Sequence, residues 1–264
     1  MTVTFGAHGT YFGTGTADPT PTYPTNIGPL SELLLIVMMK PAAANGGSCA
    51  TPAGWTLRGG NTGATDGDTG GYGTGLAADT GNMNLWIFSK DVVNGNESGT
   101  ITVDGTGSNS IVAAIVRLRK SSHGAVTWAS AVGKDTAAGN VSITTGAIDL
   151  AAGDFCFWAM AIPTDVTTPA QFSAHAISQT GSTFGTVTEG LEADNPSGND
   201  MGGYTAYASV TAGSGSGAAT FTATAGGTTT NVRGPGVLIR ARHTGAGVAS
   251  LPRPRRRHTH LIGR

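Results

Sequence analysis

Two long apolar runs stand out from the pattern of hydrophobic and polar positions along the chain. The first lies in "SELLLIVMMKP" (residues 31–41), and the second lies in "GDFCFWAMAIP" (residues 153–163). Each run follows an acidic residue, Glu32 or Asp154, and each is closed by a proline. A strand that is apolar on both faces is buried between two layers, and a proline fits only at its end. The pattern therefore predicts two buried central strands.

The chain also repeats itself with a period of about 120 residues. The two apolar runs are 122 residues apart. A strand–turn–strand pattern at residues 84–103 recurs at 204–223, and "AIVRLR" at 114–119 recurs as "VLIRAR" at 237–242. These further matches have offsets of 120 and 123 residues and keep the same order. The repeats predict an internal duplication.

The remaining pattern favours short strands. Thr-rich alternation, as in Thr220 to Ala223, is typical of half-buried strands, and no segment keeps a helical period. Turn residues recur about every 8–12 residues, as in β-sandwiches and barrels. We therefore expect an all-β protein of two tandem antiparallel β-sandwich modules of jelly-roll-like type, residues 1–120 and 121–243. A linker and a basic C-terminal arm, residues 244–264, follow them.

Composition agrees with a folded protein that is rich in turns. The chain has 42 glycines and 12 prolines, yet 39% of its residues are hydrophobic. The longest apolar run, "LLLIVMM", is far too short to span a membrane. The first residues, "MTVTFGAHGT", lack the basic and apolar regions of a signal peptide. We expect synthesis in the cytoplasm without a signal peptide, and no membrane partner.

Charge is distributed unevenly between the body and the arm. Five of the 15 basic residues lie in residues 251–264, which hold no acidic residue. Residues 1–250 therefore carry 10 basic and 16 acidic residues, a net charge of −6. A nucleic-acid-binding surface needs clustered cations, so the acidic body argues against that partner.

The arm "LPRPRRRHTHLIGR" leaves three interpretations open. Its prolines favour an extended path, its arginines can meet an acidic surface, and its last apolar pair can anchor in a groove of a neighbouring subunit. The favoured interpretation is a docking arm, and the others are contact with packaged nucleic acid and an unspecific solvated tail. The candidate interaction residues are Arg253, Arg255, Arg256, Arg257, Leu261, Ile262 and Arg264.

Two further pairs of arginines lie near the end of each expected module. Arg117 and Arg119, like Arg240 and Arg242, are two residues apart and share a face of a strand. They indicate either a solvated edge strand that resists pairing or a contact between subunits with an acidic neighbour. Both interpretations remain open from the sequence.

Candidate catalytic and metal-binding patterns are weak. "DGDTG" at residues 66–70 begins like a calcium loop, but position twelve is Ala77 and not the required Glu. His258 and His260 lack a third ligand nearby. The acidic segment "TEGLEADNPSGND" is rich in loop residues and is expected to be a solvated loop. No phosphate loop or nucleophile elbow occurs, so we expect no enzyme activity, no metal and no cofactor.

Aromatic and cysteine residues add one alternative. We expect Trp86 and Trp158 in the core and Trp55 packed at a sandwich end, which leaves Tyr72 as a free platform for a glycan. Cys49 and Cys156 do not form a disulfide framework and are expected to be unpaired thiols, one in a loop and one in a strand.

Residues 28–120, and less closely the second module, resemble a pattern common in structural proteins of tailed bacteriophages. A polar–acidic pair precedes a leucine-rich strand, "PAGW" follows, and then come the "NLWIFSKDV" strand and an aliphatic hairpin. The first copy has Ser31-Glu32 where Gly-Asp is usual, and the second keeps Gly153-Asp154. The resemblance implies a non-enzymatic virion component, such as a head decoration or cement protein, or a tail or fibre component.

These observations predict a virion structural protein that binds other virion subunits and copies of itself, for instance as a homotrimer. The alternative is a receptor- or carbohydrate-binding module of a phage tail.

Overall fold

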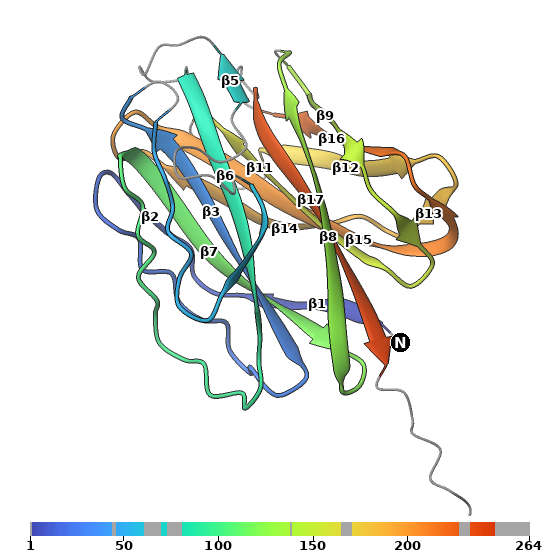
Figure 1. The fold of residues 1–264 in the computed structure, drawn as a ribbon. Coiled ribbons are helices and arrows are strands. Elements are labelled where there is room, and N and C mark those ends of the chain that lie inside the picture. The colour runs from blue at the N-terminus through green and yellow to red at the C-terminus, as the bar shows by residue number, and fades with distance from the viewer. Residues whose placement is uncertain are drawn as a thin grey trace, which may run out of the picture.

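The computed structural model describes residues 2–43, 46–60, 70–72, 81–137, 139–164, 171–226 and 233–245. These residues form seventeen β-strands and no helix, which confirms the all-β prediction (Figure 1). No segment in this part of the chain forms a helix with the length and apolar character that crossing a membrane requires. Every strand pairing among the described residues is antiparallel, and most join strands that are not consecutive in the chain, so the fold depends on long-range contacts.

The smaller sheet has the central order β1-β7-β3-β6-β4, with β2 paired to β7 and β5 paired to β6. Its central strand is the first predicted apolar run, and the strand has the predicted bounds. The strands are β1 (Val3–His8), β2 (Phe12–Thr14), β3 (Ser31–Pro41), β4 (Thr56–Gly59), β5 (Gly70–Tyr72), β6 (Gly81–Asp91) and β7 (Ser108–Lys120).

The larger sheet closes on itself, so the expected second sandwich is wrong. The path β15-β11-β17-β8-β9-β16-β12-β13 returns to β15 and forms an eight-stranded barrel, to which β10 and β14 add at β15. Between β8 and β9 the closure rests on one paired position, Gly133 opposite Thr145. The strands are β8 (Gly124–Asp135), β9 (Val141–Ala147), β10 (Leu150–Ala151), β11 (Phe155–Ile162), β12 (Phe172–Gln179), β13 (Ser182–Phe184), β14 (Thr188–Asn195), β15 (Met201–Gly215), β16 (Ala218–Ala225) and β17 (Gly234–Gly245).

Three hydrophobic cores lie in successive layers. One fills the space between the smaller sheet and the β11–β15–β17 wall of the barrel, a second fills the barrel, and a third covers the outer face of the smaller sheet. Strand β11 shows why both faces of the run are apolar. Phe157 faces the core between the sheets, whereas its neighbour Trp158 faces the barrel interior. Both predicted central strands are therefore buried on two sides, as expected.

The matched segments occupy corresponding places in the two sheets. β3 lies between β7 and β6, and β11 lies between β17 and β15. The offsets of 120 and 123 residues also preserve the side that each residue faces: Val116 and Ile239, for example, both face the core between the sheets. The offset of 122 residues does not preserve the side. It matches Leu34, which faces the core between the sheets, with Cys156, which faces the barrel interior. The duplication, and the module boundaries at 120 and 243, stay predictions.

Candidate functional site

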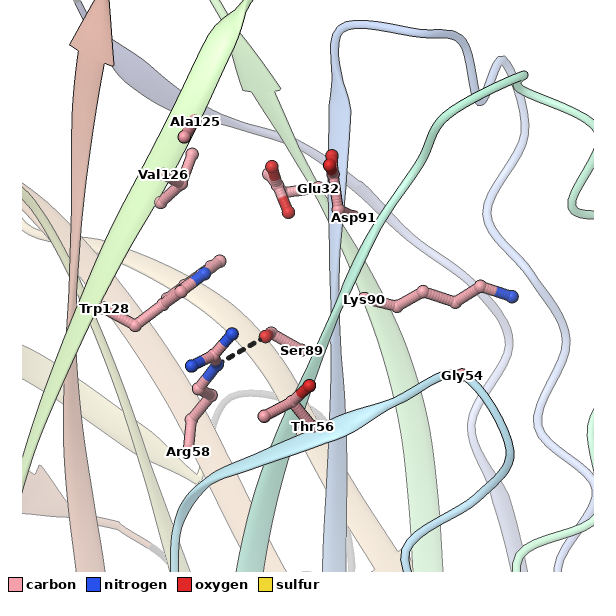
Figure 2. Close-up of a pocket in the computed structure, with 10 residues that line it drawn as sticks. All are labelled: Glu32, Gly54, Thr56, Arg58, Ser89, Lys90, Asp91, Ala125, Val126 and Trp128. Atoms are coloured by element: carbon pink, nitrogen blue, oxygen red, sulfur yellow. Dashed lines mark hydrogen bonds between the residues drawn. The ribbon is translucent and has the colours of Figure 1, made fainter.

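A hollow of about 290 Å³ lies where the two sheets meet at their edges, between β4 and β6 on one side and β8 on the other (Figure 2). We call it the β4–β8 hollow. Its walls come from both halves of the chain, because β8 belongs to the barrel. The lining residues are Glu32, Gly54, Thr56, Arg58, Ser89, Lys90, Asp91, Ala125, Val126 and Trp128.

Arg58 occupies one end of the hollow. Its Nε donates a hydrogen bond to Ser89 Oγ at 2.7 Å, and its guanidinium carbon is 5.6 Å from the centroid of the Trp128 ring. A cation over an indole face at this distance is attracted by the ring quadrupole. Burial lowers the pKa of Arg58, although Glu32 opposes this effect. The guanidinium is thus fixed in place by a hydroxyl on β6 and an aromatic ring on β8.

Trp128 forms the side wall of the hollow. The sequence prediction placed Trp86 and Trp158 in the core and Trp55 in packed surroundings, and all three are confirmed as buried. Trp128 is half-buried and packs against the edge of the core between the sheets. Sequence reasoning did not single it out as a binding residue. Exposed and half-buried positions alternate along β8 and give it a solvated face, but this alternation is seen only in the folded chain.

A carboxylate pair and a lysine occupy the other end. Lys120 Nζ donates to Glu32 Oε1 at 2.9 Å and to Asp91 Oδ1 at 3.1 Å. Burial raises the pKa of Glu32 to about 7, because desolvation outweighs the attraction of Lys120. The pKa of the more exposed Asp91 is lowered: burial raises it, but hydrogen bonds from Lys120 and Glu32 have the larger combined effect. Lys120 likewise has a raised pKa, since its two carboxylate partners outweigh its burial.

Lys90 belongs to the lining but directs its ammonium group elsewhere. Figure 2 shows its side chain pointing away from Glu32, Arg58 and Trp128. Its Nζ lies 3.5 Å from Glu97 Oε1 and 5.9 Å from the centroid of the Tyr23 ring. The charged groups around the hollow are therefore Arg58 and Lys120 against Glu32 and Asp91. With all four ionised, their charges cancel.

Three of the four paired arginines predicted on the last strand of each half bind groups within the chain. Arg117 is buried and donates through Nη1 to the carbonyls of Thr25, at 2.7 Å, and Asn26. Arg240 donates to the carbonyl of Asp149 at 3.1 Å. Arg119 is exposed. β7 and β17 each have paired strands on both sides, so the interpretation of a protected sheet edge is wrong, whereas a contact between subunits stays a prediction.

Arg242 is held by an acidic residue that the sequence analysis had noted for its position. Its Nε donates to Asp154 Oδ1 at 2.6 Å, and its Nη2 donates to Asp154 Oδ2 at 2.7 Å. Asp154 also accepts a hydrogen bond from the backbone of Ala151. The acidic residue before the second apolar strand is thus a buried anchor for β17.

The acidic segment around residue 190 is not the expected loop. Residues 188–195 form β14, which pairs with β15. Glu192 accepts hydrogen bonds from the backbone of Gln171 at 3.0 Å and Phe172 at 2.7 Å, and Glu189 lies 3.2 Å from His175 Nε2. Asp194 accepts a hydrogen bond from the Tyr11 hydroxyl at 2.8 Å. Within the ranges that the structure covers, no three His, Cys, Asp or Glu side chains are grouped to hold a metal ion.

Several predicted residues lie outside the described residues. They include all seven candidates in the arm, from Arg253 to Arg264, residues 66–69 of the "DGDTG" segment and the two histidines at 258 and 260. The side chain of Tyr72 is also outside the description, although its backbone belongs to β5. Cys49, in a loop, and Cys156, in β11, are free, as expected.

Comparison with known proteins gives no family for this chain. No protein-family model matches it, and neither the curated proteins nor the solved structures include a significant match.

Proposed function

We propose that this chain is a non-enzymatic structural protein of a tailed-bacteriophage virion, either a capsid decoration or cement protein or a tail-associated component. It binds other virion subunits and copies of itself, and its C-terminal arm docks on a neighbour. The phage context rests on the sequence resemblance in residues 28–120. The non-enzymatic role rests on how the body uses its charged side chains.

Buried charged side chains in the body hold strands and loops together through hydrogen bonds. Lys40 is fully buried in β3, and its Nζ donates to the carbonyls of Pro163 at 3.0 Å and Asp200 at 3.2 Å, which links the two halves of the chain. Buried Arg117 acts similarly, as does buried Asp154, whose carboxylate binds the half-exposed Arg242. Buried charges with several hydrogen bonds favour one fixed geometry. This use supports a rigid building block, and it is the observation that carries the proposal.

The positive charge of the arm is available for ion pairs with acidic groups outside residues 251–264. Residues 251–264 hold five arginines and no acidic residue, whereas residues 1–250 have a net charge of −6. Any ion pair that these arginines make must therefore be with another part of the chain or with another molecule. Opposite charges of this kind favour association between copies, with a strength that falls as salt rises.

Deletion of residues 251–264 tests this role directly. We expect the full chain to self-associate in a salt-dependent way, measured by light scattering coupled to size-exclusion chromatography, and the deleted chain to be monomeric at the same concentration. Its circular dichroism spectrum should be nearly unchanged, because the strand pairings of the body join residues 3–245. Equal self-association of both chains would overturn the docking role.

Two variants of the arm distinguish the effect of its positive charge from the effect of its side-chain size. Replacement of Arg253, Arg255, Arg256 and Arg257 by Lys keeps the charge and should keep most of the association. Replacement of the same four residues by Gln should remove it. An equal loss in both variants would show that charge is not what the arm contributes.

A second candidate function, glycan binding by a phage tail module, is favoured by one observation. The β4–β8 hollow combines an indole ring with hydrogen-bond donors and acceptors at its two ends.

A further inference from the structure

We propose that the β4–β8 hollow binds one neutral saccharide unit of a glycan. The proposal rests on the second candidate function and does not depend on assembly through the arm. Four side chains carry it: Trp128 at the wall, Arg58 at one end, and Asp91 with Glu32 at the other.

The size of the hollow suits a ligand no larger than a single ring. Its volume of about 290 Å³ lies at the small end of ligand sites, which occupy roughly 300–1,000 Å³. The walls are strand residues and not long loops, since Arg58 is on β4, Ser89 is on β6 and Trp128 is on β8. Side chains on strands keep their positions better than side chains on loops, so the site is largely formed before a ligand arrives.

Trp128 offers an apolar surface beside polar groups. Three of the four tryptophans are buried in the cores, and Trp128 alone is half-buried and lines a hollow. Sugar rings present C–H groups on one face and hydroxyl groups around the rim. The guanidinium of Arg58 lies over part of the Trp128 ring, so the part of the indole that it leaves uncovered can contact the first while neighbouring polar groups bind the second.

Arg58 offers hydrogen-bond donors at one end of the hollow, and Asp91 offers acceptors at the other. The hydrogen bond of Arg58 is made by Nε to Ser89, which leaves the terminal nitrogens to donate to a ligand oxygen. The Asp91 side chain is 65% exposed, and Lys120 binds only its Oδ1, so Oδ2 can accept from a ligand hydroxyl. Figure 2 shows the Arg58 end and the Glu32–Asp91 end separated by open space beside Trp128.

The balance of charge favours a neutral ligand over a charged one. Above about pH 7, where Glu32 is ionised, Arg58 and Lys120 offset Glu32 and Asp91, so the hollow then has no excess charge to attract a phosphate group. Lys120 already binds both carboxylates, at 2.9 and 3.1 Å, and a ligand ammonium would compete with it. A hydroxyl group can donate to a carboxylate without displacing Lys120.

The test is a screen of the full chain on an array of neutral and charged glycans, followed by calorimetric titration with the best neutral saccharide. We expect Trp128→Ala and Arg58→Ala each to weaken binding at least about tenfold, which corresponds to about 1.4 kcal/mol. Trp128→Phe should retain part of the affinity, because it keeps an aromatic face. Thr127→Ala, an exposed neighbour on the opposite face of β8, should bind normally.

A blocking variant covers the case in which Trp128→Ala fails to fold. Thr56 is exposed at the lining of the hollow, beside Arg58 (Figure 2), so Thr56→Trp would obstruct the site without removing a packed side chain. It should abolish binding while the melting temperature and self-association stay unchanged. Absence of any neutral saccharide ligand, or binding that persists unchanged in both Arg58→Ala and Thr56→Trp, would overturn the proposal. If deletion of the arm abolishes self-association while saccharide binding is unchanged, the docking role and the saccharide site are both supported, and each is independent of the other.

Discussion

The guanidinium of Arg242 binds the carboxylate of Asp154 through two parallel hydrogen bonds, at 2.6 Å and 2.7 Å, and ties the end of β17 to the turn before β11. The two residues differ in their exposure to water. The Asp154 side chain is only 1% exposed, whereas that of Arg242 is 38% exposed. The carboxylate therefore depends on this partner far more than the guanidinium does.

Removal of the Arg242 side chain should destabilise the fold. We expect Arg242→Ala to lower the free energy of unfolding by about 2–3 kcal/mol, because a buried carboxylate loses its charged partner while water reaches it only from one side. Arg242→Lys should recover part of the loss, since an ammonium cannot form the two parallel bonds. Urea denaturation measures the difference. Arg119→Ala, at an exposed position on β7, is the control, and an equal effect in both variants would contradict the prediction.

The Glu32 carboxylate should make stability depend on pH. Its pKa is raised by burial from 4.5 to about 7, so between these values the folded chain holds a proton that the unfolded chain releases. Stability therefore falls as pH rises through this window, by up to about 1.4 kcal/mol per pH unit. The lowered pKa of Asp91 acts in the opposite sense, but below the ordinary pKa of an Asp, and so outside this window.

Glu32→Gln isolates this effect, because the amide keeps the shape and cannot ionise. His243, whose burial lowers its pKa from 6.5, also titrates in this range but is present in both proteins. As pH rises from 5 to 8, the melting temperature of the parent chain should therefore fall relative to that of the variant. Parallel pH profiles for the two proteins would show that Glu32 is not the group responsible.

The closure of the barrel should be sensitive to a single methyl group at Gly133. A Cβ at this position would overlap the carbonyl oxygen of Thr144 and lie 2.9 Å from Ile143 Cγ2. Since Gly133 is the one position where β8 pairs with β9, relief of the overlap must separate these strands. We expect Gly133→Ala to lower the free energy of unfolding by about 1–3 kcal/mol. Gly146→Ala on β9, where a Cβ would meet no atom within 4 Å, should be close to neutral in the same denaturation experiment.

Strong local patterns made part of the fold predictable. The apolar runs at 31–41 and 153–163 define β3 and β11 because only a strand covered on both sides tolerates such a composition. Barrel closure gives no comparable local signal, since it depends on a single pairing between β8 and β9. β14 was missed for a related reason. "TEGLEADN" looks like a solvated loop, yet Glu192 there is bound by backbone N–H groups that arrive only when β12 packs nearby.

The candidate site was less predictable than the fold. Glu32 was noticed as the acidic residue before an apolar strand, but its partner Lys120 is 88 residues away along the chain. Arg58 and Trp128 are 70 positions apart and meet because β4 and β8 lie at neighbouring sheet edges. No short motif contains this set of residues. Pairing and sheet packing bring them together, and those are properties of the whole chain.

The wall formed by β11, β15 and β17 has a consequence for fragments of this protein. One of its faces completes the barrel interior, and the other, with Phe155, Phe157 and Ile239, completes the core against the smaller sheet. A fragment that contains only the barrel would expose that second face to water, and a fragment that ends near residue 120 would expose the matching face of β3. Patches of this kind promote aggregation. Soluble expression of either half should therefore require polar substitutions on its newly exposed face.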